Sequence, residues 1–490
     1  MADVRPDPDP ADDPAPAEAD RLTRVFGSRQ FFRLWIVQVT SATGDWLGFS
    51  AIIVLAARVG GSAGVGAGAV SLVLAARIVP GFLFGPLAGV LVDRWDRKRV
   101  MIACDLGRAT VVALLPFVRG LGGLVLASLA LEALTLLWSP AKEASVPKLV
   151  PASHLASANS LSLLAAYGTF PFAALLFAIL AGVSSWLGGL GVSHSLSLDQ
   201  MALAFYVDSL TFVASAALVS RLDIGGRRVS AHADASDLRR RATRALHEVR
   251  EGWHYIFINH TVRAVNLGLA MALIGGGMLI PLGAVYSTDV LHAGAAGYGV
   301  FTTALGFGVA LGALGVALLQ RRLPMERVFT TCLLLAGSLL FVAASAGTLG
   351  VATVAVGLMG VAVGPVYVSG FVLLQQEVAD DLRGRVFSSL NLLVRSCVLL
   401  SMVLGPLVAA LLGGLSQGWL GGSVEVLGVE VGLPGVRLAL WLAALIIVGA
   451  GVVALHSVRA GQRSRAFHAR RHPSQLPSTR LGPQLGELGA

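Results

Sequence analysis

The sequence predicts an all-α membrane protein with about twelve transmembrane helices in two pseudo-symmetric six-helix bundles. Three observations predict it: a composition too apolar for water, twelve long apolar runs, and an uneven distribution of lysine and arginine. Of the 490 residues, 55% are hydrophobic and only 13% are charged. Soluble proteins are about 45–50% apolar and about 25% charged. So few charges cannot cover a water-facing surface, and the bilayer must solvate most of this chain.

The apolar runs are each about 20 residues long, which is enough for a helix to cross a hydrocarbon core of about 30 Å. Six precede a polar stretch at 221–262, and six follow it. The runs cover 31–57, 66–92, 100–119, 122–140, 161–183, 201–220, 264–287, 294–318, 328–347, 350–374, 392–414 and 436–456. Such a 6+6 layout is typical of transporters built from two related halves.

The basic residues support this count of helices. With the N-terminus in the cytoplasm, the tails and the even-numbered loops hold 30 of the 37 lysines and arginines, and the opposite side holds only Arg58, Arg119 and Arg437. Cytoplasmic loops of membrane proteins carry such an excess. We therefore expect a multi-pass protein of the cell inner (plasma) membrane with both termini in the cytoplasm. The net charge of +9 then sets topology, and we expect no nucleic-acid partner.

The domain organisation follows from the runs and their flanks. Residues 1–25 are predicted to be a disordered cytoplasmic tail, 26–221 an N-terminal six-helix bundle, and 263–458 a C-terminal six-helix bundle. Between the bundles, 222–262 form a cytoplasmic connector whose apolar residues recur at helical spacing. This pattern favours an amphipathic helix on anionic headgroups, although a solvated charged helix fits it equally. Residues 459–490 are predicted to be a basic, disordered cytoplasmic tail.

The sharpest motif is GPLAGVLVDRWDRKR at residues 85–99. Gly85 and Gly89 lie four apart, on one helix face, where they would let a neighbouring helix come close. The motif resembles the loop 2–3 signature of the major facilitator superfamily. Asp96 stands where that signature usually has a glycine. The matching residues are Gly89, Asp93, Arg94, Arg97 and Lys98. The resemblance implies a conformational latch between the two halves, to which we assign these residues together with Gly85.

Two further segments narrow the resemblance. Residues 139–161 follow the fourth run and residues 375–393 follow the tenth, so they occupy equivalent places in the two halves. Both resemble the branch that contains the enterobactin exporter and macrolide efflux proteins. The second segment carries Arg383, Gly384 and Arg385, a predicted loop motif of the second half. Drug–proton antiporters often have an arginine in the fourth span, whereas this chain has Glu132 there.

Four ionisable residues lie inside the predicted spans: Asp45, Arg77, Glu132 and Asp208. A charge at the centre of a helix costs about 2.5–3.5 kcal/mol on insertion scales, so such residues usually mark a substrate or ion path. The resemblance implies that the first and fourth helices line the central cavity. We expect Asp45 or Glu132 to take up a proton as substrate leaves, with Arg77 beside it. The alternative is a structural ion pair, and for Asp208 a packing role is favoured.

The second half carries almost no charge inside its spans, and its prolines and polar residues are the remaining candidates. Pro281, Pro365 and Pro406 can kink their helices, although proline is also common in transmembrane helices. The predicted cavity face of this half consists of Asn266, Met271, Met278, Tyr286, Tyr367 and Phe371.

These features predict a secondary active transporter that exports a small amphiphilic molecule, such as a drug, a macrolide or a siderophore, by proton-coupled alternating access. The expected partners are this molecule, protons and the lipid bilayer, with the protein acting as a monomer. Import of a small nutrient is the main alternative, followed by a membrane scaffold without transport. No nucleotide-binding or hydrolase motif is recognisable, and we expect neither an enzyme nor a cofactor or metal.

Overall fold

The fold is almost entirely helical, as the composition predicts. A computed structural model describes residues 23–61, 63–92, 95–189, 201–222, 259–319, 322–378, 380–421, 423–426 and 429–471. Within these residues, twelve helical segments are long and apolar enough to cross a membrane. The prediction of twelve spans is confirmed.

The first half contributes six spans. Its helices are α2 (Arg29–Val59), α3 (Ala63–Val92), α4 (Arg97–Leu114) with η2 (Leu115–Phe117), α5 (Leu121–Glu143), α7 (Leu155–Gly168) with α8 (Phe170–Gly189), and α10 (Ala202–Ser220), besides the short turns α6 (Val146–Leu149) and η3 (Ala152–His154). Polar caps fix where two of them begin. Ser28 accepts a hydrogen bond from the Phe31 amide, and Asp96 accepts one from the Arg99 amide, so each satisfies an amide that has no partner in its helix.

The second half contributes the other six. They are α12 (His260–Gly277) with α13 (Leu279–Val285) and the π-turn η4 (Tyr286–Val290), α14 (Gly294–Leu319), α15 (Met325–Ser345), α16 (Leu349–Glu377), α17 (Asp380–Leu420) and α18 (Gly435–Arg471). A short antiparallel hairpin, β1 (Ser423–Val426) and β2 (Val429–Gly432), joins the last two.

Two spans are broken, and both breaks occur at glycine and proline. The fifth span is divided at Thr169, between Gly168 and Pro171. The seventh is divided at Met278, which follows three glycines and precedes Pro281. Proline lacks the amide that the helix needs at this point. Pro365 and Pro406, in contrast, lie inside the continuous helices α16 and α17, so of the three predicted kinks only the one at Pro281 coincides with a break.

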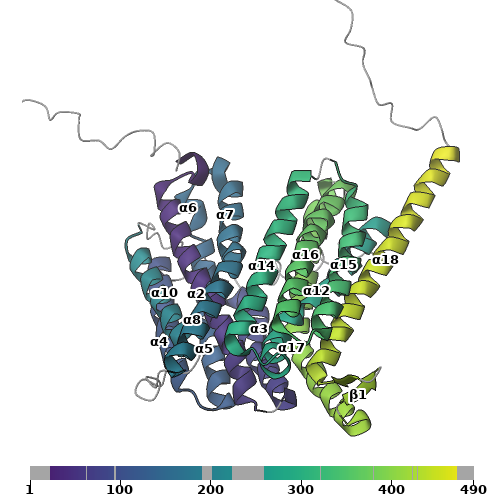
Figure 1. The fold of residues 1–490 in the computed structure, drawn as a ribbon. Helices are drawn as coiled ribbons and strands as arrows, with labels where there is room; N and C mark the ends of the chain where they lie inside the picture. The colour runs from purple at the N-terminus through teal and green to yellow at the C-terminus, as the bar shows by residue number, and fades with distance from the viewer. Residues whose placement is uncertain are drawn as a thin grey trace, which may run out of the picture.

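The first described helix begins and the last described helix ends at the same face of the molecule. In Figure 1, α2 begins and α18 ends at the upper face, which we call the termini face, and the hairpin lies at the lower, opposite face. Helix α18 continues to Arg471, beyond residue 458 and into the segment predicted to be disordered. The connector, 223–258, with its predicted amphipathic helix, lies outside the described residues, as do 1–22 and 472–490.

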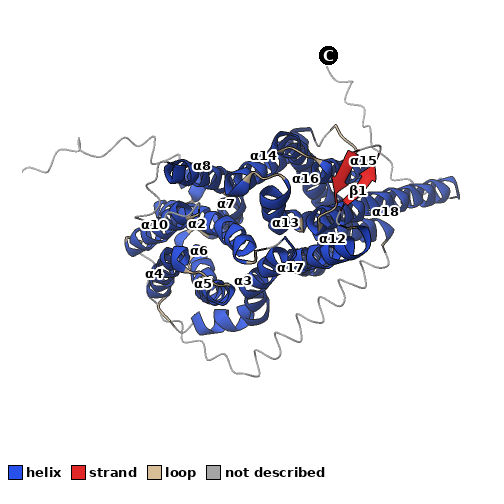
Figure 2. Cartoon of the chain, turned by 60° about the horizontal axis from the view of Figure 1, so that its bottom comes forward, coloured by secondary structure: helices blue, strands red, loops and turns tan. Residues whose placement is uncertain are grey.

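The halves meet mainly through two pairs of helices, α3 with α17 and α8 with α14, and α13 also contacts α2 and α3. Figure 2, which brings the opposite face forward, shows both pairs side by side. Toward the termini face, the upper ends of α7 and α14 are separated. The Ser71 hydroxyl donates to the Val403 carbonyl between α3 and α17, and the rings of Phe172 and Phe307 lie edge to face at 5.4 Å between α8 and α14.

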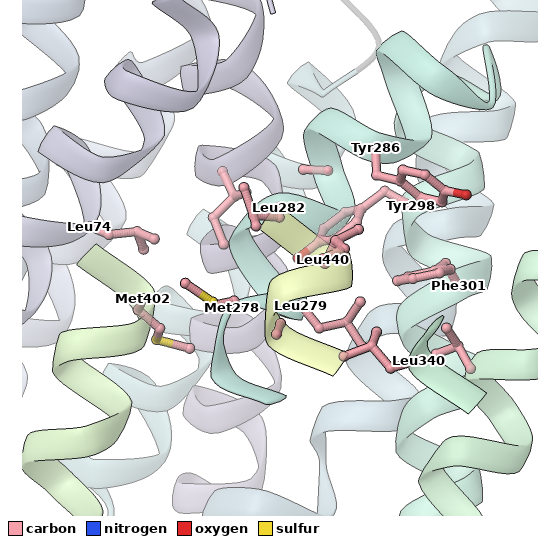
Figure 3. Close-up of a cluster of buried hydrophobic side chains, with 14 of the residues drawn as sticks. Leu74, Met278, Leu279, Leu282, Tyr286, Tyr298, Phe301, Leu340, Met402 and Leu440 are labelled. Atoms are coloured by element: carbon pink, nitrogen blue, oxygen red, sulfur yellow. The ribbon is translucent and has the colours of Figure 1, made fainter. Parts of the chain in front are cut away.

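The core is apolar and continuous across this junction. Leu74 of α3 lies close to Met402 of α17, with Met278 beside them (Figure 3). Large apolar side chains also cover the outside, for example Leu126, Leu318 and Trp419, which are 69%, 75% and 87% exposed. An outer surface of this kind suits hydrocarbon rather than water.

Candidate functional site

The candidate site centres on Asp45 in the middle of α2, where the carboxylate lies between two guanidinium groups. Arg77 of α3 places Nη2 3.7 Å from Oδ1 of Asp45, and Arg108 of α4 places Nη1 3.3 Å from Oδ2. The Asp45 side chain is 33% exposed, whereas Arg77 is 14% and Arg108 1% exposed. Asp45 is therefore the member of this group that is accessible from outside the protein.

Arg108 is positioned by a buried carboxylate. It forms an ion pair with Asp105, which lies one helical turn earlier on α4, and the Ser215 hydroxyl of α10 donates to Asp105 at 2.8 Å. The guanidinium also lies over the rings of Phe212 and Trp138, 4.4 and 5.0 Å from their centres. Cations over aromatic faces are stabilised by the ring quadrupole. Arg108 is thus a fixed anchor for Asp45.

Asp105 and Arg108 were not among the site residues predicted from the sequence. The available signal was their spacing: an acid and a base three residues apart share one face of a helix, and here both fall inside the apolar run 100–119. Such a pair inside a span indicates a buried ion pair, because either charge alone would be costly there.

Glu132 of α5 lies against α3 rather than against Asp45. A Cβ added at Gly81 would collide with Oε1 of Glu132, so the absence of a side chain at Gly81 makes room for this carboxyl group. Gly81 follows Arg77 by one helical turn. Of the two acids expected as partners for Arg77, Asp45 forms the ion pair among the described residues, and Glu132 lies one turn away.

Asp208 of α10 is buried against the other side of α2. Its side chain is 2% exposed. A Cβ added at Gly44 would lie 2.5 Å from Oδ1 of Asp208, and one added at Gly48 would collide with Oδ2. The structure thus gathers all four predicted residues, together with Asp105 and Arg108, into one polar centre inside the N-terminal half.

The predicted latch is described only in part, since Asp93 and Arg94 lie outside the described residues. Arg97 donates to the Ala144 carbonyl at 2.9 Å, and Lys98 donates to the Leu222 carbonyl at 2.8 Å. Both bonds stay within the first half. Among the described residues, nothing lies within 4 Å of a Cβ added at Gly85, so they show no close helix approach at this glycine. A latch between the halves stays a prediction.

The predicted loop motif of the second half is helical. Arg383, Gly384 and Arg385 lie in the first turns of α17, which begins at Asp380.

Two residues expected on the cavity face of the second half have structural roles. The Tyr286 hydroxyl lies 2.8–3.2 Å from the carbonyl oxygens of Ala343, Ala344 and Ala346, at the end of α15. Asn266 is 1% exposed and donates to the Val262 carbonyl within its own helix. Tyr367 is 37% exposed and stacks on Phe371 at 6.1 Å, so these two remain candidates for a cavity face.

A cavity of about 450 Å³ lies at the opposite face, between the end of α2 and η4. Arg58, Asp289 and His292 contribute its charged and titratable groups. None of the charges of the polar centre lines it. The cavity marks the place where the two halves approach one another at this face.

Comparison with known proteins places this geometry in context. The family model of the Major Facilitator Superfamily matches residues 34–398. The chain is 26% identical to the MFS-type transporter YfiS of Bacillus subtilis over 80% of this chain and 87% of that protein. It is 27% identical to the multidrug efflux pump Tap of Mycobacterium tuberculosis over 83% of this chain and 93% of that one.

Solved structures show the same fold. A bacterial homologue of the lysosomal transporter Spinster, in an inward-facing and unoccupied conformation, superposes with a TM-score of 0.65 and 15% identity over 88% of this chain and 97% of the other. The nucleoside transporter NupG superposes with a TM-score of 0.58 and 14% identity over 88% and 99%. At such identities the likeness concerns the fold alone.

Proposed function

Because the chain belongs to the major facilitator superfamily, we propose that this transporter exports a small amphiphilic molecule in exchange for protons. It is a multi-pass membrane transporter for a small-molecule substrate, and it is not an enzyme. The observation that carries the proposal is Asp45, a partly exposed carboxylate between two guanidinium groups at mid-membrane. Ionisable residues at this depth are expensive and usually functional.

The proposed orientation places the termini face in the cytoplasm of a plasma-membrane protein that works as a monomer. The excess of lysine and arginine on that side supports this orientation. In this orientation, α7 and α14 are separated at their cytoplasmic ends, which favours an inward-facing conformation. The contacts of α3 with α17 and of α8 with α14 then close the outer side.

The proposed coupling step is the protonation of Asp45. A proton from the outer side would convert its carboxylate to a neutral acid, and the attraction to Arg77 and Arg108 would weaken. Arg108 keeps Asp105 as a partner, whereas among the described residues the only ion pair of Arg77 is the one with Asp45. Arg77 is therefore the side chain that is released, and Glu132 lies within one turn to receive it.

The proposed substrate class follows from the charge balance of the centre. Among the described residues of the centre, the acids Asp45, Asp105 and Glu132 outnumber the cations Arg77 and Arg108 even without Asp208, so the centre accepts positive charge more readily than negative charge. A cationic amphiphile meets that requirement. The similarity to the pump Tap, whose name describes multidrug efflux, supports the same class.

The test is accumulation of ethidium, a macrolide and a siderophore in cells that express wild type, Asp45→Asn or Glu143→Gln. Glu143 is an exposed acid at the end of α5 and serves as the control. We expect lower accumulation of at least one compound with wild type and with Glu143→Gln, and none of this reduction with Asp45→Asn. Higher accumulation with wild type would indicate import. Equal accumulation of all three, with the protein present in the membrane, would reject drug export.

Proton coupling requires a second measurement. In everted vesicles, which expose the cytoplasmic side, an imposed pH gradient should drive uptake of the exported compound by wild type. Collapse of the gradient with an ionophore should abolish this uptake. Uptake that persists without the gradient, or that is unchanged in both Asp45→Asn and Glu132→Gln, would contradict the coupling step.

A further inference from the structure

Asp208 is a buried acid without a cation of its own. Its side chain is 2% exposed, and within the described part of the chain it forms no ion pair. Its one side-chain hydrogen-bonding partner there is the Thr211 hydroxyl, 3.5 Å from Oδ1. That hydroxyl donates more closely, at 2.7 Å, to the Asp208 backbone carbonyl. Thr211 therefore offers the carboxyl group little stabilisation.

The neighbouring helices supply no free positive charge. Helix α2 brings Asp45 near to Asp208, and α4 brings Asp105 and Arg108. Arg108 and the more distant Arg77 are engaged by Asp45 and Asp105. Helix α8, the remaining long helix against α10, contains no charged residue. An ionised Asp208 would thus add to this centre a negative charge that has no cation paired with it.

The surface that receives Asp208 is made of glycine backbone. Gly44 and Gly48, one helical turn apart on α2, leave a notch that the two carboxyl oxygens fill. Such close contact expels water from the carboxyl group. An isolated ionised carboxylate in a water-free setting is so costly that the group takes up a proton instead.

We propose that Asp208 binds a proton in this notch and that it forms a proton site separate from Asp45. The neutral acid lets α10 pack directly on α2, because a neutral group does not repel the Asp45 carboxylate beside it. Loss of the proton puts a negative charge on Asp208 as well as on Asp45. The two charges then lie on either side of α2, because Asp208 contacts Gly44, the chain neighbour of Asp45. Helix α2 must then move away from α10, or Arg108 must leave Asp105. Proton occupancy of Asp208 thereby controls the contact between the first and sixth spans.

The proposal stands apart from the substrate and direction of transport, so its test requires neither. The full-length protein is purified in lipid nanodiscs, and infrared spectra are recorded for wild type, Asp208→Asn and Asp45→Asn at neutral pH. A protonated carboxylic acid has a carbonyl stretch distinct from that of a carboxylate. We expect wild type and Asp45→Asn to show this band and Asp208→Asn to lose a share that corresponds to one acid. An unchanged band in Asp208→Asn would overturn the proposal.

A stability profile provides the second readout. As the pH rises and the buried acid must ionise, the midpoint of thermal unfolding of wild type should fall, and the fall should be absent in Asp208→Asn. Asp208→Ser, which is smaller than the notch, replaces Asp208→Asn if that variant does not fold. Identical pH profiles for wild type and the variant would overturn the proposal. A rise in the unfolding midpoint with sodium instead of protons would also overturn it and assign the notch to a metal cation.

Discussion

Arg108 is the residue on which the polar centre depends most. It is 1% exposed and contacts Asp45 and Asp105. Removal of one partner from a buried ion pair costs about 3–5 kcal/mol, because the other charge stays buried without compensation. We expect Arg108→Ala to lower the thermal unfolding midpoint strongly. Arg99→Ala, at an exposed position on the same helix, should leave the midpoint unchanged.

The chemistry of the guanidinium group sharpens this prediction. Lysine carries the same charge but cannot engage two carboxylates and stack flat on rings in the same way. Arg108→Lys should therefore recover only part of the lost stability. Full stability of Arg108→Ala would contradict an anchoring role, and full recovery by lysine would reduce that role to charge alone.

Gly81 controls the position of Glu132. A Cβ at Gly81 would displace the Glu132 carboxyl group, while alanine in place of glycine favours the helix by about 0.5–1 kcal/mol. Gly81→Ala should thus keep or slightly raise stability and still reduce transport. Gly68→Ala on the same helix, where an added Cβ would have no described atom within 4 Å, is the matched control. Equal transport by both variants would remove Glu132 from the coupling step.

The sequence predicted the charged residues of the site better than their pairing. Asp45, Arg77 and Glu132 are conspicuous because a charge near the centre of an apolar run is expensive. Asp105 was missed because the apolar run 100–119 starts beside a basic loop. A charged residue near the start of this run resembles a part of the loop. Its partner Ser215 is 110 residues away in the chain. Only the packing of α4 on α10 brings the two together, and no local pattern encodes that packing.

At the scale of elements, Tyr286 and Arg437 hold the end of α15. The Tyr286 hydroxyl and the Arg437 guanidinium share the carbonyls of Ala344 and Ala346. Loss of the hydroxyl leaves buried carbonyls with fewer donors, which costs about 1–3 kcal/mol. We expect Tyr286→Phe to lower the thermal unfolding midpoint. The cost should lie near the lower end of this range, because Arg437 still donates to two of the carbonyls.

The control for this helix end is Tyr167→Phe. Tyr167 is 67% exposed, and no hydrogen bond of its hydroxyl to a described residue is lost, so its replacement by phenylalanine should leave the unfolding midpoint unchanged. Transport by Tyr286→Phe should be retained at temperatures where the protein is folded. Loss of transport without loss of stability would instead return Tyr286 to the cavity face, where the sequence analysis placed it.

The sequence predicted the spans closely but not their internal breaks. Apolar runs locate helices because only a helix satisfies every backbone group in lipid. Whether a proline breaks its helix depends on neighbours. Gly275 approaches the Ala443 carbonyl of α18, so α12 is pressed against another helix just before the break at Met278. Pro365 lies within a helix that continues. Gly364 beside Pro365 also lies close to a neighbouring helix, since an added Cβ would collide with the Val309 carbonyl of α14, so a close helix contact alone does not decide which proline breaks its helix.

At the scale of the whole molecule, the 6+6 organisation follows from the count of runs, but the conformation does not. Contacts such as Ser71 with Val403 join residues 332 positions apart. Two conformations of a transporter share nearly all contacts within each half. They differ in the few contacts between the halves, and these select the state that the structure represents.

Gly299 offers a way to hold the opposite face apart. A Cβ there would lie 2.7 Å from the backbone nitrogen and Cα of Ala178, so any larger side chain must separate α14 from α8. We expect Gly299→Leu to fold but to transport poorly, with cysteines introduced near this junction becoming reactive toward water-soluble reagents. Gly315→Leu, on the same helix and with no described atom within 4 Å of an added Cβ, should behave as wild type. Unchanged transport by Gly299→Leu would show that this contact is dispensable.

The same position can also be used to hold the halves together, and the two changes should have opposite conformational effects. A Cβ at Gly299 would lie 2.7 Å from the Ala178 Cβ, and a disulfide needs a Cβ separation of about 3.8 Å, so a small separation of α8 and α14 accommodates the bond. In a background without Cys104, Cys332 and Cys397, the variant Ala178→Cys/Gly299→Cys should crosslink on oxidation.

Alternating access requires this face to open once per cycle. Transport should therefore stop on oxidation and return with a reductant, whereas each single cysteine variant should be insensitive to both. Transport that continues at the same rate in fully crosslinked protein would mean that α8 and α14 stay together throughout the cycle, and the halves would have to move about a different pair of helices.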